Sequence, residues 1–196
     1  AYTDIKAAIE VVDEIKAKLV TARGEGVDRA KIQTEIDQLQ DQLSGIAESA
    51  VISGADNWLS VDSSAAGYNA VKTVVSSFTR SNGAVTIQTI DIDTAGMKLY
   101  DAGAGAGEVG ILDGMRDATG AIAGAGTFSI AALDISALTN STADLATLES
   151  YILGADAALS EARARIDRHL NTPAKGDADR APLPGLKSVR DAEFLG

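Results

Sequence analysis

The glycines between residues 101 and 114 are the first residues whose types and spacing could support chemistry. Gly105, Gly107 and Gly110 form the pattern G-x-G-x-x-G, which in nucleotide-binding enzymes lets the backbone approach a pyrophosphate at the start of a helix. That chemistry also needs a buried strand before the glycines, a long helix after them and a carboxylate about 20 residues further on. Residues 111–120 are too short and too interrupted by glycine to form such a helix. We therefore expect a surface connection between strands and no bound cofactor.

Two further groups of polar residues could bind a metal or act as a base. Asp91, Asp93 and Asp101 supply carboxylates, but without the regular spacing, glycine and closing glutamate of a helix-loop-helix calcium site. His169 stands among charged residues near the expected end of a helix, where a cation interacts favourably with the helix dipole. No serine or cysteine can be placed beside it as a nucleophile. The residues predict neither a metal site nor catalytic residues, and we expect a protein that is not an enzyme.

Composition excludes several classes of partner. The 196 residues carry a formal net charge of −11 and include no cysteine. Nucleic acids and anionic membranes attract basic faces, so we expect neither as a partner. No apolar run approaches the roughly 20 residues that span a bilayer, and residues 1–6 do not resemble a signal peptide. Because the chain begins almost inside a helical pattern and without methionine, we expect it to be a fragment of a longer protein.

Two amphipathic helices are expected at the start of the chain. From Thr3 to Ala22 the apolar residues recur in steps of three and four and form one stripe, and a glycine-rich break follows before Asp28, a plausible N-cap. The second helix carries an uninterrupted heptad seam with polar residues between its members. Their pattern predicts an antiparallel hairpin of helices. The stripes consist of Ile5, Ile9, Val12, Ile15 and Leu19 in the first helix and of Ile32, Ile36, Leu39, Leu43 and Ile46 in the second.

A third helix is expected near the other end of the chain, where it would cover the apolar faces of the first two. Residues 141–144 fit a capping box. Apolar residues again follow at steps of three and four, namely Leu145, Leu148, Ile152, Ala155 and Leu159. Ile36, Leu39 and Leu43 are expected to contribute most to the packing of the hairpin, and Leu39→Ala to cost about 2–5 kcal/mol.

The residues between the second and third helices have a β-like pattern. Residues 71–78 are rich in β-branched side chains, and residues 81–83 are a hairpin turn signal. Residues 85–92 alternate with a slip in phase between 87 and 90, which predicts a bulge. Shorter strands are expected at 97–100, 127–130 and 133–135. Trp58 is interpreted as a core residue where helix gives way to strand.

The fold class predicted from these elements is α+β. A partial antiparallel bundle of three long helices would carry a small β-rich domain inserted between the second and third helices. We expect a helical hairpin at 1–52, a β-rich, variable outer region at 53–140 and a returning core helix at 141–170. Residues 171–196 hold all three prolines and are expected to form a disordered, atypical tail.

Several of these segments resemble bacterial flagellin, in particular the flagellins of alphaproteobacteria. The resemblance lies in residues 1–9, 27–39, 46–50, 57–59 and 133–136, and it covers about residues 1–160. It implies a secreted structural subunit of the extracellular flagellar filament, which contributes to motility by helix packing and self-assembly. It also implies other flagellin subunits, an export chaperone and the filament cap as partners. The residues leave one alternative open, a non-flagellar surface adhesin or binding module with a helical stalk and a β tip.

Three features depart from the flagellin pattern. The extreme terminal helices that mediate polymerisation are missing at the front, so this fragment is expected not to build filaments alone. From about Ala162 onwards the sequence no longer resembles the family, although Ile166 keeps step with Leu159. Residues 13–20 lack the arginine-rich pattern of flagellins that stimulate the innate flagellin receptor, so we expect weak recognition by that receptor.

Overall fold

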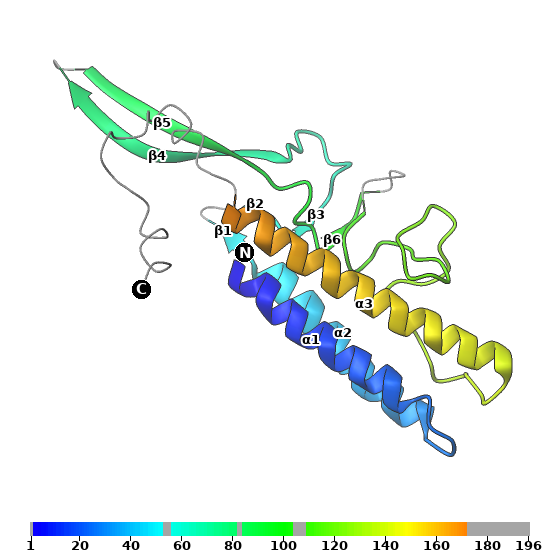
Figure 1. Cartoon of the computed structure of the whole chain (residues 1–196). Helices are drawn as coiled ribbons and strands as arrows, with labels where there is room; N and C mark the ends of the chain where they lie inside the picture. The colour runs from blue at the N-terminus through cyan, green and yellow to red at the C-terminus, as the bar shows by residue number, and fades with distance from the viewer. Residues whose placement is uncertain (1, 53–55, 82–83, 104–108, 172–196) are drawn as a thin grey trace, which may run out of the picture.

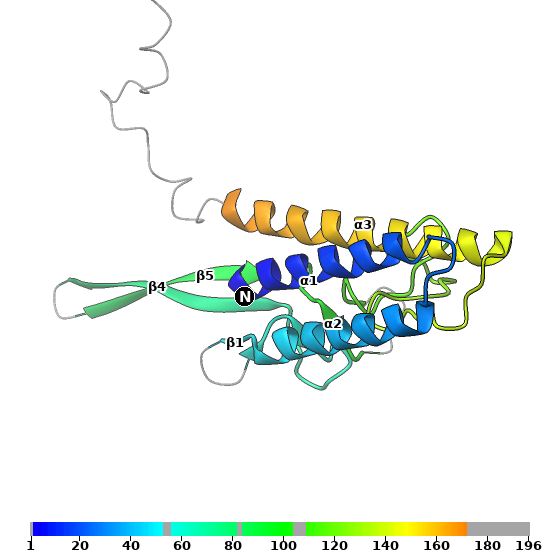
Figure 2. The same ribbon diagram turned by 90° about the horizontal axis from the view of Figure 1, so that it is seen from below.

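The computed structural model describes residues 2–52, 56–81, 84–103 and 109–171 of the chain. In this part, three helices and six strands follow one another in the order α1, α2, β1 to β6, α3. Helix α1 (Tyr2–Thr21) packs against both α2 (Arg29–Ser49) and α3 (Thr142–Asn171). It lies between these two helices, antiparallel to each of them (Figures 1 and 2). The α+β class predicted from the sequence is confirmed.

Helix α1 forms where the spacing of apolar residues predicts it. Ile5, Val12, Ile15 and Leu19 are at most 3% exposed, and Ile9 is half-buried at the flank of the stripe. The helix therefore turns one face to α2, α3 and the loops beneath them. Its opposite face carries charged and small residues into solvent.

Helix α2 begins at the predicted cap but turns a different face to the core. The Asp28 carboxylate accepts a hydrogen bond from the Lys31 N–H at 3.1 Å. Ile36 and Leu43 are fully buried, whereas the other members of the predicted seam (Ile32, Leu39 and Ile46) are only half-buried. Besides Ile36 and Leu43, the buried residues of α2 are Arg29, Gln33 and Ala47. The buried stripe is thus rotated toward polar residues that the sequence pattern assigned to the outside.

Helix α3 is the longest of the described helices and begins directly after the predicted cap. The Ser141 hydroxyl accepts a hydrogen bond from the Asp144 N–H at 3.1 Å. The Asp144 carboxylate accepts hydrogen bonds from the hydroxyl and N–H of Thr139, and these bonds, together with the Ser141 hydroxyl, lower its pKa. Leu148, Ile152 and Leu159 are buried, but Leu145 in the first turn is 36% exposed, one turn beyond the place where α3 meets the end of α1.

The strands form three separate two-stranded sheets. Two are minimal: β1 (Val51–Ile52) pairs antiparallel with β2 (Asp56–Asn57), and β3 (Ser60–Val61) pairs parallel with β6 (Tyr100–Asp101). The third is a long antiparallel hairpin of β4 (Val71–Ser81) and β5 (Ala84–Asp93). This hairpin projects away from the helices, beyond the end of the bundle at which the chain begins (Figure 1).

The predicted irregularity of the hairpin is present, but the extra residue lies on the other strand. Val75 pairs with Thr89 and Ser77 pairs with Gln88, so Ser76 is the bulged residue of β4. The phase slip in the sequence of β5 therefore lies opposite the bulge in β4. The predicted turn at residues 82–83 lies outside the described residues.

Three predicted short strands are wrong in whole or in part. Of residues 97–100, Tyr100 alone belongs to a strand; Met97 ends a turn over residues 95–97, and residues 98 and 99 are irregular. Residues 127–130 and 133–135 run as irregular chain, with one isolated bridge between Phe128 and Arg116. The carbonyls of Ile130 and Leu133 and the N–H of Ile135 bond glutamine side chains of α2 instead of a neighbouring strand, while residues 127 and 128 bond the backbone of Arg116. The predicted tail after Asn171 lies outside the described residues.

Candidate functional site

Backbone N–H groups on either side of the glycine motif donate hydrogen bonds to the carboxylate of Asp113. Residues 104–108 lie outside the described residues, so the motif is described only at its last glycine. The Gly110 N–H donates to Asp113 Oδ1 at 2.8 Å, and the Asp101 N–H donates to Asp113 Oδ2 at 2.7 Å. Burial raises the pKa of Asp113, although these two backbone bonds oppose the shift. The amides on both sides of the glycine run therefore bind an internal carboxylate.

The three aspartates considered as cation ligands have separate partners. Asp101 accepts hydrogen bonds from Lys98 Nζ at 2.7 Å and from the N–H groups of Ser63 and Gly103, both at 2.9 Å. Asp91 accepts a hydrogen bond from the Thr73 hydroxyl, and Asp93 accepts one from the Ala95 N–H. In the described part of the chain, no group of three or more His, Asp or Glu side chains is arranged to hold a metal ion.

The structure describes the side chain of Trp58 but not that of His169. Trp58 is half-buried and packs against the core directly after β2, beside Leu59, which is fully buried. Asn57 holds this junction, because its amide donates to the carbonyls of Ala47 and Glu48 and its Oδ1 accepts from the Leu59 and Ser60 N–H groups. His169 belongs to the last turns of α3, and its side chain lies outside the described residues.

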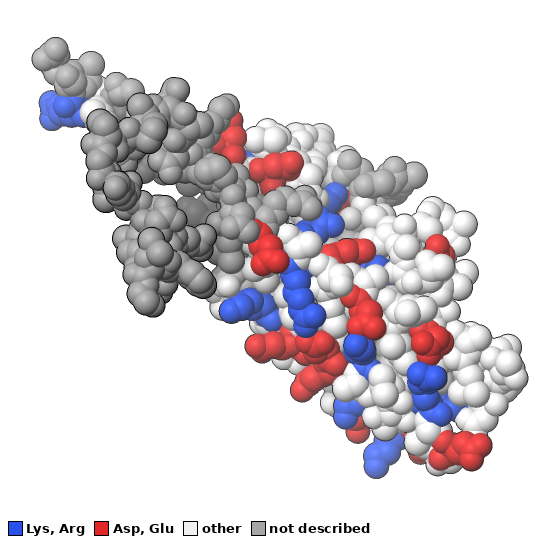
Figure 3. All heavy atoms as spheres, viewed as in Figure 1, with Lys and Arg blue, Asp and Glu red and all other residues white. Residues whose placement is uncertain are grey.

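Ion pairs follow the seam between α1 and α3. Asp13 pairs with Arg163 at 3.1 Å, Lys16 with Asp156 at 2.5 Å and Arg23 with Glu149 at 3.0 Å. The Asp13–Arg163 pair has the opposite polarity to the other two, so a shift that brought Lys16 opposite Arg163 would place like charges together, and this disfavours sliding in that direction. Each pair is exposed enough that it contributes little to stability by itself. On the face shown in Figure 3, acidic and basic side chains are interspersed over the helices without a large patch of one sign.

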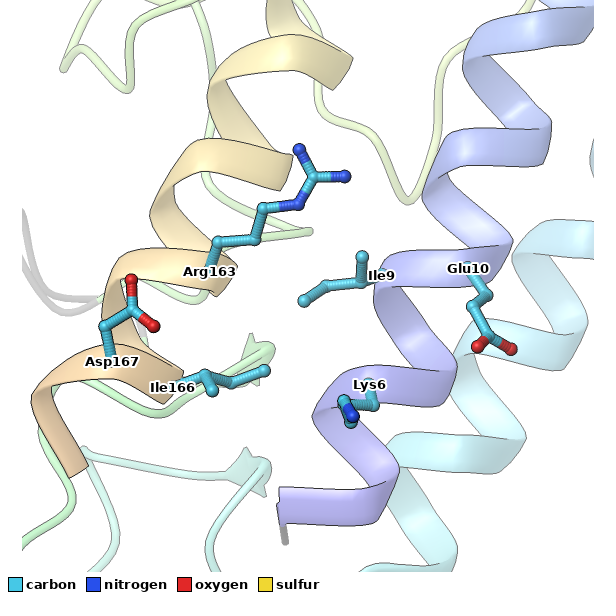
Figure 4. Close-up of a pocket in the computed structure, with 6 residues that line it drawn as sticks. All are labelled: Lys6, Ile9, Glu10, Arg163, Ile166 and Asp167. Atoms are coloured by element: carbon cyan, nitrogen blue, oxygen red, sulfur yellow. The ribbon is translucent and has the colours of Figure 1, made fainter. Parts of the chain in front are cut away.

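A small hollow lies between α1 and α3 near their ends. Its volume is about 260 Å³, and it is lined by Lys6, Ile9, Glu10, Arg163, Ile166 and Asp167. Ile9 and Ile166 point toward each other from the two helices, while Glu10 points away from α3 (Figure 4). The hollow is therefore an apolar recess with charged groups around it, open at the end of the helix array.

Polar side chains of α2 that the sequence interpretation placed on the surface hold the irregular segment before α3. Gln33 Oε1 accepts from the Ile135 N–H at 2.8 Å, and its amide donates to the Leu133 carbonyl at 3.3 Å. The Gln40 amide donates to the Ile130 carbonyl at 3.0 Å. Arg29 is 8% exposed and donates to the carbonyls of Ala22 and Leu138 and to the Asn140 side chain. Counting heptads from Ile36 and Leu43 would have placed these polar residues on the buried stripe.

Arg116 is a second residue that the sequence interpretation did not single out. Its side chain is fully buried, and its guanidinium donates to the carbonyls of Ile111 at 2.7 Å and Gly120 at 2.8 Å. It also pairs with the Glu161 carboxylate of α3 at 3.0 Å. The partners lie up to 45 residues away, so no local spacing in the sequence indicates this contact.

The projecting hairpin carries an exposed apolar surface. The bulge adds one residue to β4, so Val75 and Phe78 fall on the same face although they are three residues apart. Their neighbours on that face of β5 include Ile87, which pairs with Phe78, and Val85. We call these four residues the hairpin patch. Their exposed fractions are 48% for Val75, 71% for Phe78, 60% for Val85 and 55% for Ile87.

The described structure combines helices that bury apolar seams, an open recess between α1 and α3, and a hairpin with exposed apolar side chains. Exposed apolar patches of this kind mark sites of contact with other molecules. In the described part of the chain, no helix is both long enough and apolar enough to span a membrane.

Comparison with known proteins confirms the resemblance to alphaproteobacterial flagellins. Flagellin B of Rhizobium meliloti strain 1021 is 52% identical over 115 residues, which are 58% of this chain and 28% of that protein. Flagellin A of the same strain is 50% identical over the same shares, and Flagellin D of Rhizobium meliloti is 48% identical over 119 residues, 60% of this chain and 28% of that protein. The chain thus spans little more than a quarter of the length of these relatives. No family model matches it.

Proposed function

We propose that the chain is part of a structural subunit of the bacterial flagellar filament, located outside the cell and contributing to motility by assembly and not by catalysis. The observation that carries this proposal is the identity of about 50% with flagellins over 58% of the chain. At this identity over more than 100 residues, the matched part of the chain corresponds to a segment of those proteins.

The surfaces of the chain support a role in which copies pack against one another. The hairpin patch exposes four large apolar side chains, and a two-stranded hairpin with both faces in water gains stability when a neighbour covers it. Burial of apolar area contributes roughly 25 cal/mol per Å², so contacts repeated between many subunits add up to a stable assembly. The partners are therefore other flagellin subunits.

The division of the chain into parts is also a proposal. The helical hairpin and the returning helix form a core, and the hairpin of β4 and β5 forms an outer part. Residues 110–138 lie within the outer region predicted at 53–140 but contribute Ile130, Leu133 and Ile135, each at most 2% exposed, to the core. We assign them to the helical core and restrict the outer part to residues near the hairpin.

The finer partners are proposed from the resemblance alone. A flagellin subunit would meet an export chaperone and the filament cap on its route into the filament. Residues 13–20 lie on α1, where Asp13 and Lys16 pair with α3. We expect weak stimulation of the innate flagellin receptor, and strong stimulation in a receptor-reporter assay would contradict this expectation.

A chimeric flagellin tests the proposed function directly. The matching segment of Rhizobium meliloti Flagellin A is replaced by the corresponding segment of this chain in a strain that makes no other flagellin. We expect filaments visible by electron microscopy and restored swimming, because the grafted helices and hairpin would offer the same packing surfaces. A matched graft with Ile36 and Leu43 both changed to Asp serves as the control that cannot pack. A stable, exported chimera that forms no filament would contradict the proposal.

A further inference from the structure

Residues 117–127 form a loop against α3 that buries little apolar surface, and we call it the clasp loop. Ala118, Thr119, Ala121, Gly124 and Ala125 are exposed, and Ile122 is its one large apolar residue, half-buried. Hydrophobic burial therefore contributes little to holding this loop in place. Its internal backbone bonds are local: the N–H groups of Asp117, Gly120 and Gly126 donate to the carbonyls of Ala121, Asp117 and Ala123 at 2.9–3.0 Å, so they hold the loop together as a unit without reaching α3.

Arg116 connects the start of the loop to α3. Its guanidinium donates to the Gly120 carbonyl within the loop and to both carboxylate oxygens of Glu161, at 3.0 and 3.4 Å. Its backbone also closes the far end of the loop, because the Thr127 N–H donates to the Arg116 carbonyl at 2.8 Å. A fully buried guanidinium is stable only while these acceptors surround it. Arg116 Nε has no hydrogen-bond partner, which leaves the buried group short of one bond.

The contact between the loop and α3 has two glycines at its centre. Gly120 has a φ of 85°, and a Cβ there would lie 2.5 Å from the backbone carbon of Leu153. On the helix side, a Cβ at Gly154 would lie 2.6 Å from the Phe128 ring. At Gly120 the loop meets the helix backbone to backbone, so a small displacement of the loop separates this contact.

We propose that the clasp loop is a two-state latch on α3, that Arg116 and Glu161 hold it closed, and that it opens as a unit while the three helices stay packed. The separate opening follows from the contacts, because the seams of α1 with α2 and with α3 use none of the loop residues. Opening hydrates Arg116 and Glu161, the latter already 30% exposed in its side chain, and uncovers the α3 backbone at Leu153 and Gly154, against which Gly120 lies. The latch gives α3 a surface that can be covered or exposed, independently of whether the chain builds filaments.

Hydrogen exchange of the whole chain with Arg116→Gln tests this proposal. We expect exchange of the amides of Asp117, Gly120, Ala123 and Thr127 to accelerate by about tenfold or more, which corresponds to at least about 1.4 kcal/mol of opening free energy. Glu161→Gln keeps an acceptor but removes the charge, so it should give a smaller acceleration at the same amides. Gly120→Ala should open the loop without touching either charge.

Arg163→Gln is the matched control, because Arg163 is an exposed arginine on α3, the helix that carries Glu161, and it pairs with Asp13 instead of the loop. We expect it to leave the loop amides unchanged. Loop amides that exchange at the parent rate in Arg116→Gln would overturn the proposal. Equal acceleration throughout α1, α2 and the loop would also overturn it, because the loop would then have no opening of its own. The same loop response in Arg163→Gln would overturn the role of Arg116.

Discussion

Two opposite charges, Lys98 and Asp101, are buried together under the junction of β3 and β6. Their side chains are 5% and 0% exposed, and Asp101 takes two further bonds from backbone N–H groups. Burial raises the pKa of Asp101, but the hydrogen bonds from Lys98, Ser63 and Gly103 outweigh it and lower the pKa below its ordinary value. The pair is stable because every acceptor of the carboxylate is used, and each member depends on the other.

Asp101→Asn is therefore predicted to lower the free energy of unfolding by about 3–5 kcal/mol at neutral pH, because it removes the carboxylate that neutralises the buried Lys98 ammonium. A carboxyl group with a lowered pKa stabilises the fold above its unfolded-state pKa, and this contribution is lost as the pH falls through the lower folded-state pKa. The difference between the parent and the variant should narrow below pH 3.8, the ordinary value for this group. Urea unfolding at several pH values measures it.

The control for this substitution is Asp93→Asn, at an exposed carboxylate that accepts one bond from the Ala95 N–H. It is expected to change stability by no more than about 0.5 kcal/mol. A cost for Asp101→Asn that is as small as that of the control, or that does not change with pH, would show that the buried pair has no special role.

Among the elements, α2 shows best how far the sequence leads. Its start at Asp28 follows from local chemistry and is confirmed, because the Asp28 carboxylate caps the helix. The choice of buried stripe is not local. Gln33 and Gln40 bond the backbone of residues 130–135, which have no neighbouring strand, so the helix turns these glutamines inward. A pattern that counts apolar residues alone cannot predict that a polar side chain is buried because it bonds the backbone of a distant irregular segment.

This rotation changes the predicted cost of truncating leucines in α2. Leu43 is fully buried, and Leu43→Ala is expected to cost about 2–5 kcal/mol of unfolding free energy. Leu39 is half-buried at the edge of the core, so Leu39→Ala removes fewer contacts and is expected to cost less than half as much. The two variants are the same chemical change on one helix, so each is the control for the other in chemical denaturation. Equal costs would mean that the seam predicted from the heptads is the buried one.

At the scale of the whole molecule, the helices and the long hairpin have opposite relations to solvent. The helix seams bury their apolar residues within the chain, and the contacts of Arg116, Gln33 and Arg29 tie the irregular residues to them. The hairpin exposes its apolar residues and makes its extensive contacts only between its own strands. The alternation of β4 and β5 predicts the hairpin from sequence. The hairpin projects because it makes few contacts with the rest of the chain, and a local sequence pattern does not predict which elements will contact it.

The hairpin patch gives the last prediction, which depends on the proposed function. In the chimeric flagellin, Phe78→Ser is expected to reduce filament formation strongly and to leave the free energy of unfolding within about 0.5 kcal/mol, because Phe78 is 71% exposed in the subunit. Val74→Ser is the control on the opposite face of β4, since Val74 pairs with Ile90 across the other side of the hairpin. Filament yield after export and subunit stability are measured for both variants. If Phe78→Ser assembles as well as Val74→Ser, the patch is not a contact between subunits, and the covering of the hairpin must be sought on its other face.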